Sequence, residues 1–248
     1  MSAGLTVRQF GSLKCSVVED QDAENQPPLL VILNHGFGAS GEDLVDFGPW
    51  LMEGSATLTA ACRFVFPEAP IDLSSLGMPG ARAWWPINMA KLAEINQTQN
   101  FEELTLLNPP GMDRATSLLE QAIREMQGEW GYSDAACVIG GFSQGAMVST
   151  NLILETGLQP ALLALFSGTL LNRERWTQLA DAHPGCQVLQ SHGDQDLLLP
   201  REPAIDLSQL LSNAGFEVEF LTFRGPHTIP MQVLSRFRER LEEVVERL

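Results

Sequence analysis

The sequence has no long apolar run and little cysteine, and each scarcity excludes a class of protein. No stretch of 18 or more apolar residues occurs, so no transmembrane helix is predicted. The N-terminal segment MSAGLTVRQFGSLKC lacks the apolar core of a secretory signal peptide. The 4 cysteines are scattered without a short paired spacing, which predicts neither a disulfide framework nor a zinc site. These features together lead us to expect a cytoplasmic protein.

Basic side chains are scarce as well. The chain has 15 Lys and Arg against 31 Asp and Glu, which gives a formal net charge of −16. Nucleic acids and anionic membrane surfaces are bound through lysine and arginine, so neither is an expected partner. We therefore expect a small-molecule or acylated substrate. Nothing in the sequence indicates an oligomeric state.

The order of predicted elements indicates one α/β domain over residues 1–248. Hydrophobic residues make up 44% of the chain and charged residues 19%, as in an ordinary globular protein. Apolar strands alternate with amphipathic helices, which predicts a mostly parallel central sheet with helices on both faces. Predicted strands cover 5–10, 13–20, 29–38, 63–70, 135–141, 161–168, 186–193 and 216–223; predicted helices cover 115–127, 146–157, 203–215 and the segment from 231 onward.

One predicted strand ends at an isolated serine. Gly141-Phe142-Ser143-Gln144-Gly145 fits G-x-S-x-G, with an apolar strand before it and a helix after it. A nucleophilic serine at a strained strand-to-helix turn needs small neighbours because the turn is crowded. The alternative is a glycine-lined turn whose serine caps the following helix. The motif and its context favour Ser143 as a nucleophile.

A serine nucleophile requires a base, and the chain has only 4 histidines. On an elbow of this kind the partners follow in the order serine, acid, histidine. His35 precedes the serine, His192 precedes the candidate acids, and His183 lies in a surface-type loop, DAHPG. His227, in the loop between the last strand and the last helix, is therefore the candidate base.

Two aspartates qualify as the acid. Asp194 and Asp196 both lie in SHGDQD, directly after a predicted strand. Either one equally suits a turn, which is the common place for aspartate beside glycine. A metal site at HGDQD is a poorer interpretation, since no second cluster of ligands occurs in the sequence.

The reaction also needs donors for a developing oxyanion. The backbone N–H of Gln144, directly after the nucleophile, is one candidate. The turn in LNHGFGASG supplies the other, the N–H of Phe37, because its flanking glycines let the backbone face the site. A phosphate-binding glycine loop is the alternative, but the turn lacks the lysine of a P-loop and the spacing of a dinucleotide fingerprint.

These segments occur in a familiar order. NHGFG, FPEAP, GGFSQGA, HGDQD and GPH together resemble the phospholipase/carboxylesterase family of α/β-hydrolases, which includes the acyl-protein thioesterases. The resemblance implies the α/β-hydrolase fold and hydrolysis of esters or thioesters through an acyl-enzyme, with no cofactor and no metal. It also implies Asp196 as the acid, and structural roles for His35 and His192. A peptidase or amidase with the same triad, and a non-catalytic binding protein on this fold, are the alternatives.

The sequence departs from that family around residues 84–111. Trp84-Trp85-Pro86 stands where the family has tryptophan, an aromatic residue and aspartate, and Asn88–Gly111 is longer than expected. Two helix-like pieces, MAKLAEI and FEELTLL, make up this segment. We expect a lid-like insertion at about 88–111 that presents apolar side chains to an acyl chain, with Trp84 and Trp85 as substrate-binding residues. The alternative is two short helices packed on the body, with both tryptophans in the core.

Overall fold

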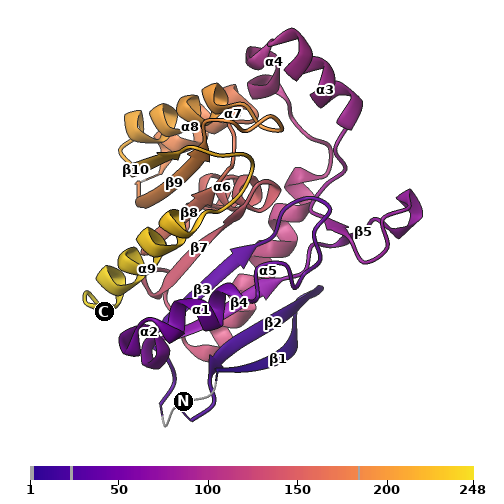
Figure 1. Cartoon of the computed structure of the whole chain (residues 1–248). Coiled ribbons are helices and arrows are strands. Elements are labelled where there is room, and N and C mark those ends of the chain that lie inside the picture. Colours follow the sequence, from indigo (N-terminus) through magenta and orange to yellow (C-terminus); the bar gives the residue numbers. More distant parts are fainter. Residues whose placement is uncertain (1–2, 23–24, 184) are drawn as a thin grey trace.

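The central sheet of the computed structural model is mostly parallel (Figure 1). The structure describes residues 3–22, 25–183 and 185–248. The two antiparallel pairings lie at one edge of the sheet, and the other neighbouring strands pair in parallel. The strands are, in spatial order, β1 (Ala3–Phe10), β2 (Leu13–Asp20), β4 (Cys62–Pro67), β3 (Leu29–Asn34), β7 (Cys137–Phe142), β8 (Leu162–Phe166), β9 (Gln187–Gly193) and β10 (Glu217–Phe223). A separate hairpin pairs β5 (Ile71–Asp72) with β6 (Arg82–Ala83).

Helices cover both faces of the sheet, as the sequence predicts. One face packs against α5 (Met112–Trp130), α6 (Gln144–Thr156), α7 (Arg173–Ala182) and α8 (Arg201–Asn213). The other face packs against α1 (Phe47–Glu53), α2 (Ala56–Ala61) and α9 (Met231–Val245). Strands β3, β4 and β8 are buried along their whole length, because layers on both faces exclude water from a parallel sheet.

Three of these helices are absent from the prediction. Helices α1 and α2 have 7 and 6 residues, too few for a helical period to stand out in a window of about 11 residues or more. In α7 the fully buried side chains are Trp176 and Ala180, so its apolar stripe is thin. Tertiary packing therefore decides these helices more than local pattern does.

The segment 88–111 contains two short helices, as expected. They are α3 (Met89–Thr98) and α4 (Phe101–Leu106), and Figure 1 shows them standing away from the sheet. The Asn88 side chain caps α3 by accepting from the Lys91 N–H at 3.0 Å. Helix α4 contacts α7 and α8. No helix in the described ranges is long and apolar enough to cross a membrane.

Candidate active site

Ser143 occupies the sharp turn between β7 and α6. Its backbone has φ 54° and ψ −117°, a conformation that non-glycine residues rarely adopt and that costs of order 1–3 kcal/mol. Ser143 occupies the N-cap position of α6, but its side chain makes no capping hydrogen bond, so the interpretation of this side chain as a helix cap is not supported. A strained serine whose side chain does not cap the helix is the arrangement expected of a nucleophile elbow.

The glycines around Ser143 allow the turn to approach β3. A Cβ atom on Gly145 would lie 1.9 Å from the Asn34 carbonyl oxygen, and one on Gly141 would lie 2.2 Å from the same atom. Both distances are far below van der Waals contact. The glycines of G-x-S-x-G are therefore required by the close packing of the α6 N-terminus on the end of β3, and this packing presents Ser143 at the carboxyl edge of the sheet.

His227 and Asp196 form a hydrogen-bonded pair beside this turn. The His227 Nδ1 atom lies 2.6 Å from the Asp196 Oδ2 atom, and the Asp196 side chain is fully buried. The His227 ring also packs on the Phe142 ring, with centroids 4.7 Å apart. Since Nδ1 donates its proton to Asp196, the basic atom of the neutral ring is Nε2. This Nε2 atom makes no hydrogen bond within the described part of the chain.

Ser143 and His227 line the same small cavity, of about 130 Å³. Phe37, Phe142 and Met147 also line it. The structure therefore brings together residues from three loops that lie far apart in the sequence.

Asp194 plays a different part from Asp196. Its Oδ1 atom accepts the Gly225 N–H at 3.1 Å, and the Gln195 N–H donates to the Gly225 carbonyl at 3.0 Å. These bonds join the loop after β9 to the loop that carries His227. Asp194 is thus the turn residue of the pair, while Asp196 contacts the ring.

The two predicted oxyanion donors flank the elbow. Neither the Phe37 N–H nor the Gln144 N–H donates to a protein acceptor among the described residues. Gln144 is the first residue of α6, where the positive end of the helix dipole favours negative charge. Phe37 lines the small cavity, and its neighbour Gly38 donates to the Arg82 carbonyl at 2.9 Å, which fixes the turn.

The Gln144 side chain has a role that sequence reasoning missed. Its Oε1 atom accepts the Trp84 N–H at 2.9 Å, and its Nε2 atom donates to the Trp85 carbonyl at 2.9 Å. The buried amide therefore fixes the backbone of the two tryptophans to the elbow. Gln144 and Trp84 lie 60 positions apart in the sequence and meet only through the tertiary fold, so no sequence signal pointed to this role.

His35 and Trp84 support the turn that carries Phe37. The His35 Nε2 atom accepts the Ala69 N–H at 3.0 Å, and its Nδ1 atom donates to the Gly36 carbonyl at 2.8 Å. Burial lowers the pKa of His35, so the ring is neutral, as these two bonds require. The Trp84 indole donates to the His35 carbonyl at 3.0 Å and is 1% exposed. Trp84 thus lies in the core behind the turn, which corrects its prediction as a substrate-binding residue.

Trp85 lines a second and larger cavity, of about 430 Å³, between residues 86–110 and the body. This apolar cavity shares four side chains with the small cavity beside Ser143: Ile87, Leu92, Met147 and Leu199. The charged residue in its lining is Lys91, whose ammonium pairs with Glu103 at 2.6 Å and Glu94 at 3.3 Å. The cavity therefore suits an uncharged apolar group.

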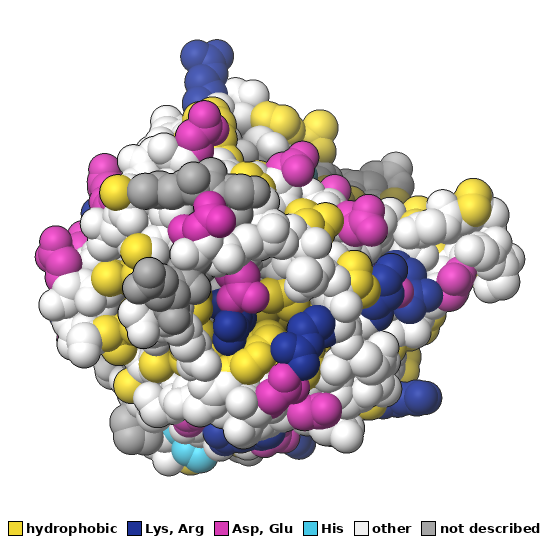
Figure 2. All heavy atoms as spheres, turned by 90° about the horizontal axis from the view of Figure 1, so that it is seen from below, with side chains coloured by type: hydrophobic (Ala, Val, Ile, Leu, Met, Phe, Trp, Pro, Cys, Tyr) yellow, Lys and Arg dark blue, Asp and Glu magenta, His cyan; other side chains and the backbone are white. Residues whose placement is uncertain are grey.

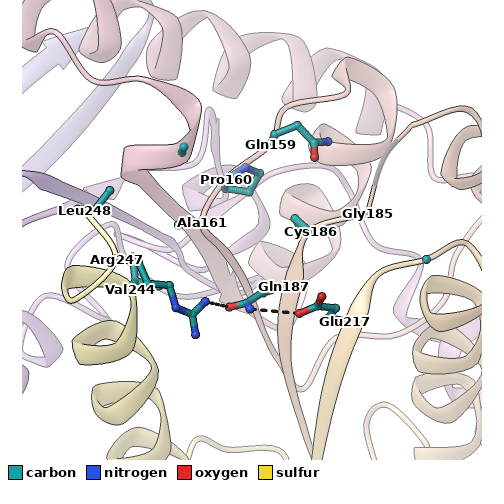
Figure 3. Close-up of a pocket in the computed structure, with 12 residues that line it drawn as sticks. Gln159, Pro160, Ala161, Gly185, Cys186, Gln187, Glu217, Val244, Arg247 and Leu248 are labelled. Carbon is teal, nitrogen blue, oxygen red and sulfur yellow. Dashed lines mark hydrogen bonds between the residues drawn. The ribbon is translucent and has the colours of Figure 1, made fainter.

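A cavity of similar volume, about 430 Å³, lies at the amino ends of the strands, opposite the end that carries Ser143 (Figure 3). The Gln187 side chain accepts from Arg247 at 2.9 Å and donates to Glu217 at 3.2 Å, so these three polar side chains of the cavity are hydrogen-bonded to one another.

Seen from below, the surface intersperses acidic and basic side chains around hydrophobic ones and shows no continuous basic patch (Figure 2). Ser143, Asp196 and His227 lie at the carboxyl ends of the strands. The described residues contain no cluster of three or more His, Cys, Asp or Glu suited to a metal ion.

Comparison with known proteins identifies similar chains. The phospholipase/carboxylesterase family model matches residues 13–245. Acyl-protein thioesterase 1 of Candida albicans is 26% identical over 229 residues, which cover 88% of this chain and 92% of the relative. The crystal structure of esterase PE8 superposes with a TM-score of 0.71 at 24% identity, covering 92% of this chain and 97% of that one. TT1662 from Thermus thermophilus superposes with a TM-score of 0.73 at 17% identity, covering 99% of each chain.

At these identities the structural matches establish the fold, which is the α/β-hydrolase fold predicted from the sequence. The family model spans nearly the whole chain. The chain therefore belongs to the phospholipase/carboxylesterase family, a family of hydrolases that act on esters and thioesters.

Proposed function

We propose that this chain hydrolyses carboxylic esters or thioesters through an acyl-enzyme intermediate, with Ser143 as nucleophile, His227 as base and Asp196 as acid. The observation that carries the proposal is the strained backbone of Ser143, at φ 54°, on a cavity that His227 also lines. The bond from His227 to the buried Asp196 supports the roles of the other two residues.

In the proposed first half-reaction, the Ser143 Oγ atom attacks the acyl carbonyl carbon while His227 Nε2 takes the hydroxyl proton. The carbonyl oxygen becomes an oxyanion, which accepts hydrogen bonds from the Phe37 and Gln144 amides. The tetrahedral intermediate then breaks its C–O or C–S bond. His227 returns the proton to the leaving alcohol or thiol, and the acyl group stays on Ser143.

In the second half-reaction, water attacks the acyl-enzyme and gives its proton to His227. Collapse of this second intermediate breaks the bond to Ser143, which recovers its proton, and the carboxylic acid leaves. Throughout, Asp196 keeps the Nδ1 proton of His227 in place and stabilises the imidazolium.

The larger cavity supports an apolar acyl group as the substrate. In the proposed arrangement, the acyl chain passes from Ser143 beside Met147 and Leu199 into the space under α3 and α4. The residues that line this space are apolar apart from the paired Lys91 and three uncharged polar residues, Asn88, Asn108 and Thr169. Segment 88–111 is thus proposed as a lid-like insertion that provides one wall of the acyl site. The acyl-protein thioesterase relatives agree with an acylated substrate.

Labelling with a fluorophosphonate probe tests the nucleophile. The wild-type protein should gain one probe mass and the Ser143→Ala variant should gain none, with a loss of about 10⁴-fold or more in kcat. Residual activity within tenfold of wild type would assign the nucleophile to another residue. Failure of the folded wild-type protein to react would favour the non-catalytic alternative.

A substrate panel tests the bond that is cleaved. Acyl esters, acyl thioesters and peptide amides of matched acyl length should release alcohol and thiol with wild type and neither with Ser143→Ala. Preferential release of amine from peptides would instead favour the peptidase or amidase alternative.

We further propose a cytoplasmic location. All four cysteines are free thiols, which suits a reducing compartment. Burial raises the pKa of Cys15 to about 12 and that of Cys137 to about 11, which keeps both thiols protonated and unreactive. Fractionation of cells that express the tagged full chain tests this location, and recovery in a secreted or membrane fraction would contradict it.

A further inference from the structure

The loop after β9, residues 196–200, carries the proposed acid and is defined here as the acid loop. Two of its side chains pack little against the rest of the protein, since Leu197 is 88% exposed and Leu198 is 38% exposed. Two of its amides turn inward: the N–H groups of Leu198 and Leu199 donate to Asp196 Oδ1 at 3.0 and 2.9 Å. The orientation of the Asp196 carboxylate is thus tied to the backbone of its own loop.

Side chains from outside the loop hold its carbonyl groups. The Asn96 Nδ2 atom donates to the Leu197 carbonyl at 3.1 Å and to the Leu198 carbonyl at 3.0 Å. The buried His192 ring contributes its Nε2 atom, which lies 2.8 Å from the Leu199 carbonyl. Three consecutive carbonyls are therefore bound by two side chains.

These two anchors differ in origin. His192 belongs to β9, the strand from which the loop starts. Asn96 belongs to α3, within the segment 88–111, and it reaches the loop across about a hundred positions of sequence. The orientation of its amide follows from the contacts, because a carbonyl oxygen accepts only from the NH₂ group.

We propose that Asn96 is a positioning residue for Asp196. By holding the two exposed positions of the acid loop, it fixes the carboxylate that in turn fixes the His227 ring. The insertion then sets the rate of the chemical step as well as providing a wall of the acyl site. This role rests on the proposed function of Asp196 and His227.

Kinetics of Asn96→Ala test the proposal, with Gln97→Ala as the matched control. Gln97 is the next residue of α3 and is exposed, so its replacement alters the same helix without touching the acid loop. An acetyl ester is used because its short acyl group makes the least use of the apolar cavity. Asn96→Ala should lower kcat for this ester by about 10- to 100-fold with little change in KM, because small misplacement of a catalytic group is costly. Gln97→Ala should stay close to wild type.

The result that overturns the proposal is an unchanged kcat for the acetyl ester in Asn96→Ala, with effects confined to KM for long acyl chains. Such a result would make Asn96 a residue of the acyl wall only. The Ser143→Ala variant separates this outcome from failure of the proposed function, since it reports on the nucleophile independently.

A proton NMR measurement decides the question even without turnover. The His227 Nδ1 proton, bonded to a buried carboxylate, should give a strongly downfield resonance, identified by its loss in His227→Gln. The resonance should shift or broaden in Asn96→Ala and stay in place in Gln97→Ala. An unchanged resonance in Asn96→Ala would contradict the positioning role.

Discussion

The two walls of the candidate site are held in different ways. On the sheet side, Ser143 and Asp196 are 8% and 7% exposed, and every residue of α6 from Gln144 to Leu154 is buried. On the insertion side, α3 buries only Leu92 and Ile95, and α4 buries only Leu104 and Thr105. Few buried contacts give a region low local stability. The sheet wall therefore suits chemistry, which needs fixed geometry. The insertion wall suits adaptation to different acyl groups, except at Asn96, whose hydrogen bonds tie α3 to the acid loop.

The contrast between the walls shows most strongly at Asp196, on the sheet side. Asp196→Asn should lower kcat near neutral pH by about 10⁴-fold, because an amide favours the wrong tautomer of His227 and does not stabilise its imidazolium. Asp194→Asn is the matched control. Its amide oxygen still accepts from the Gly225 N–H, so its kcat should stay within tenfold of wild type. Steady-state kinetics of both variants measure the difference, and the reverse ranking would assign the acid to Asp194.

On the insertion side, the expected effect concerns acyl length. For wild type, kcat/KM should rise from acetyl toward medium chains by roughly fourfold per methylene, since each buried methylene contributes about 0.8 kcal/mol. Replacing residues 88–111 by a Gly/Ser link should flatten this profile. Far-UV circular dichroism and a cooperative unfolding transition of the shortened protein serve as the control for folding. A folded protein that keeps the wild-type profile would show that the segment has no part in substrate choice.

Met147 lies on the sheet wall, because α6 carries it, and it lines both cavities. Met147→Ala should widen the passage between the cavities and shift the preferred acyl length upward, by a few-fold in relative kcat/KM. Met126→Ala removes a buried methionine of α5 and is the matched control. Both variants should lose stability, about 2–5 kcal/mol each. If the two give the same acyl-length profile, Met147 does not separate the cavities.

The smallest expected effect concerns pH and the turn behind Phe37. Burial lowers the pKa of His35, whereas in the unfolded chain the pKa stays near about 6.5. Between the two pKa values the unfolded state binds a proton at His35 and the folded state does not. The contribution of neutral His35 to the free energy of unfolding is therefore complete above the pKa of the unfolded chain. It is lost as pH falls from there toward the lowered folded pKa. Denaturant unfolding between pH 5 and 8 should show a shallower decline for His35→Gln than for wild type, and equal declines would refute this assignment.

Sequence reasoning reached the elements whose physical cause is local. The glycines of G-x-S-x-G are set by the crowded turn at Ser143, and long apolar runs mark the buried strands. With only 4 histidines, chain order and the loop around His183 select His227, which the structure brings to the same cavity as Ser143. The two short helices of 88–111 likewise follow from their own pattern.

Other features depend on contacts between distant parts of the chain, and these only the tertiary structure decides. Asp194 and Asp196 lie two positions apart after the same strand, and the pairing of β9 with β10 determines which carboxylate reaches His227. Trp84 and Trp85 are adjacent and both aromatic, yet one packs behind the turn at Phe37 and the other lines the apolar cavity. Local sequence fixes backbone strain and periodicity. The direction in which a side chain points within a loop depends on hydrogen bonds to neighbouring loops, which no local pattern records.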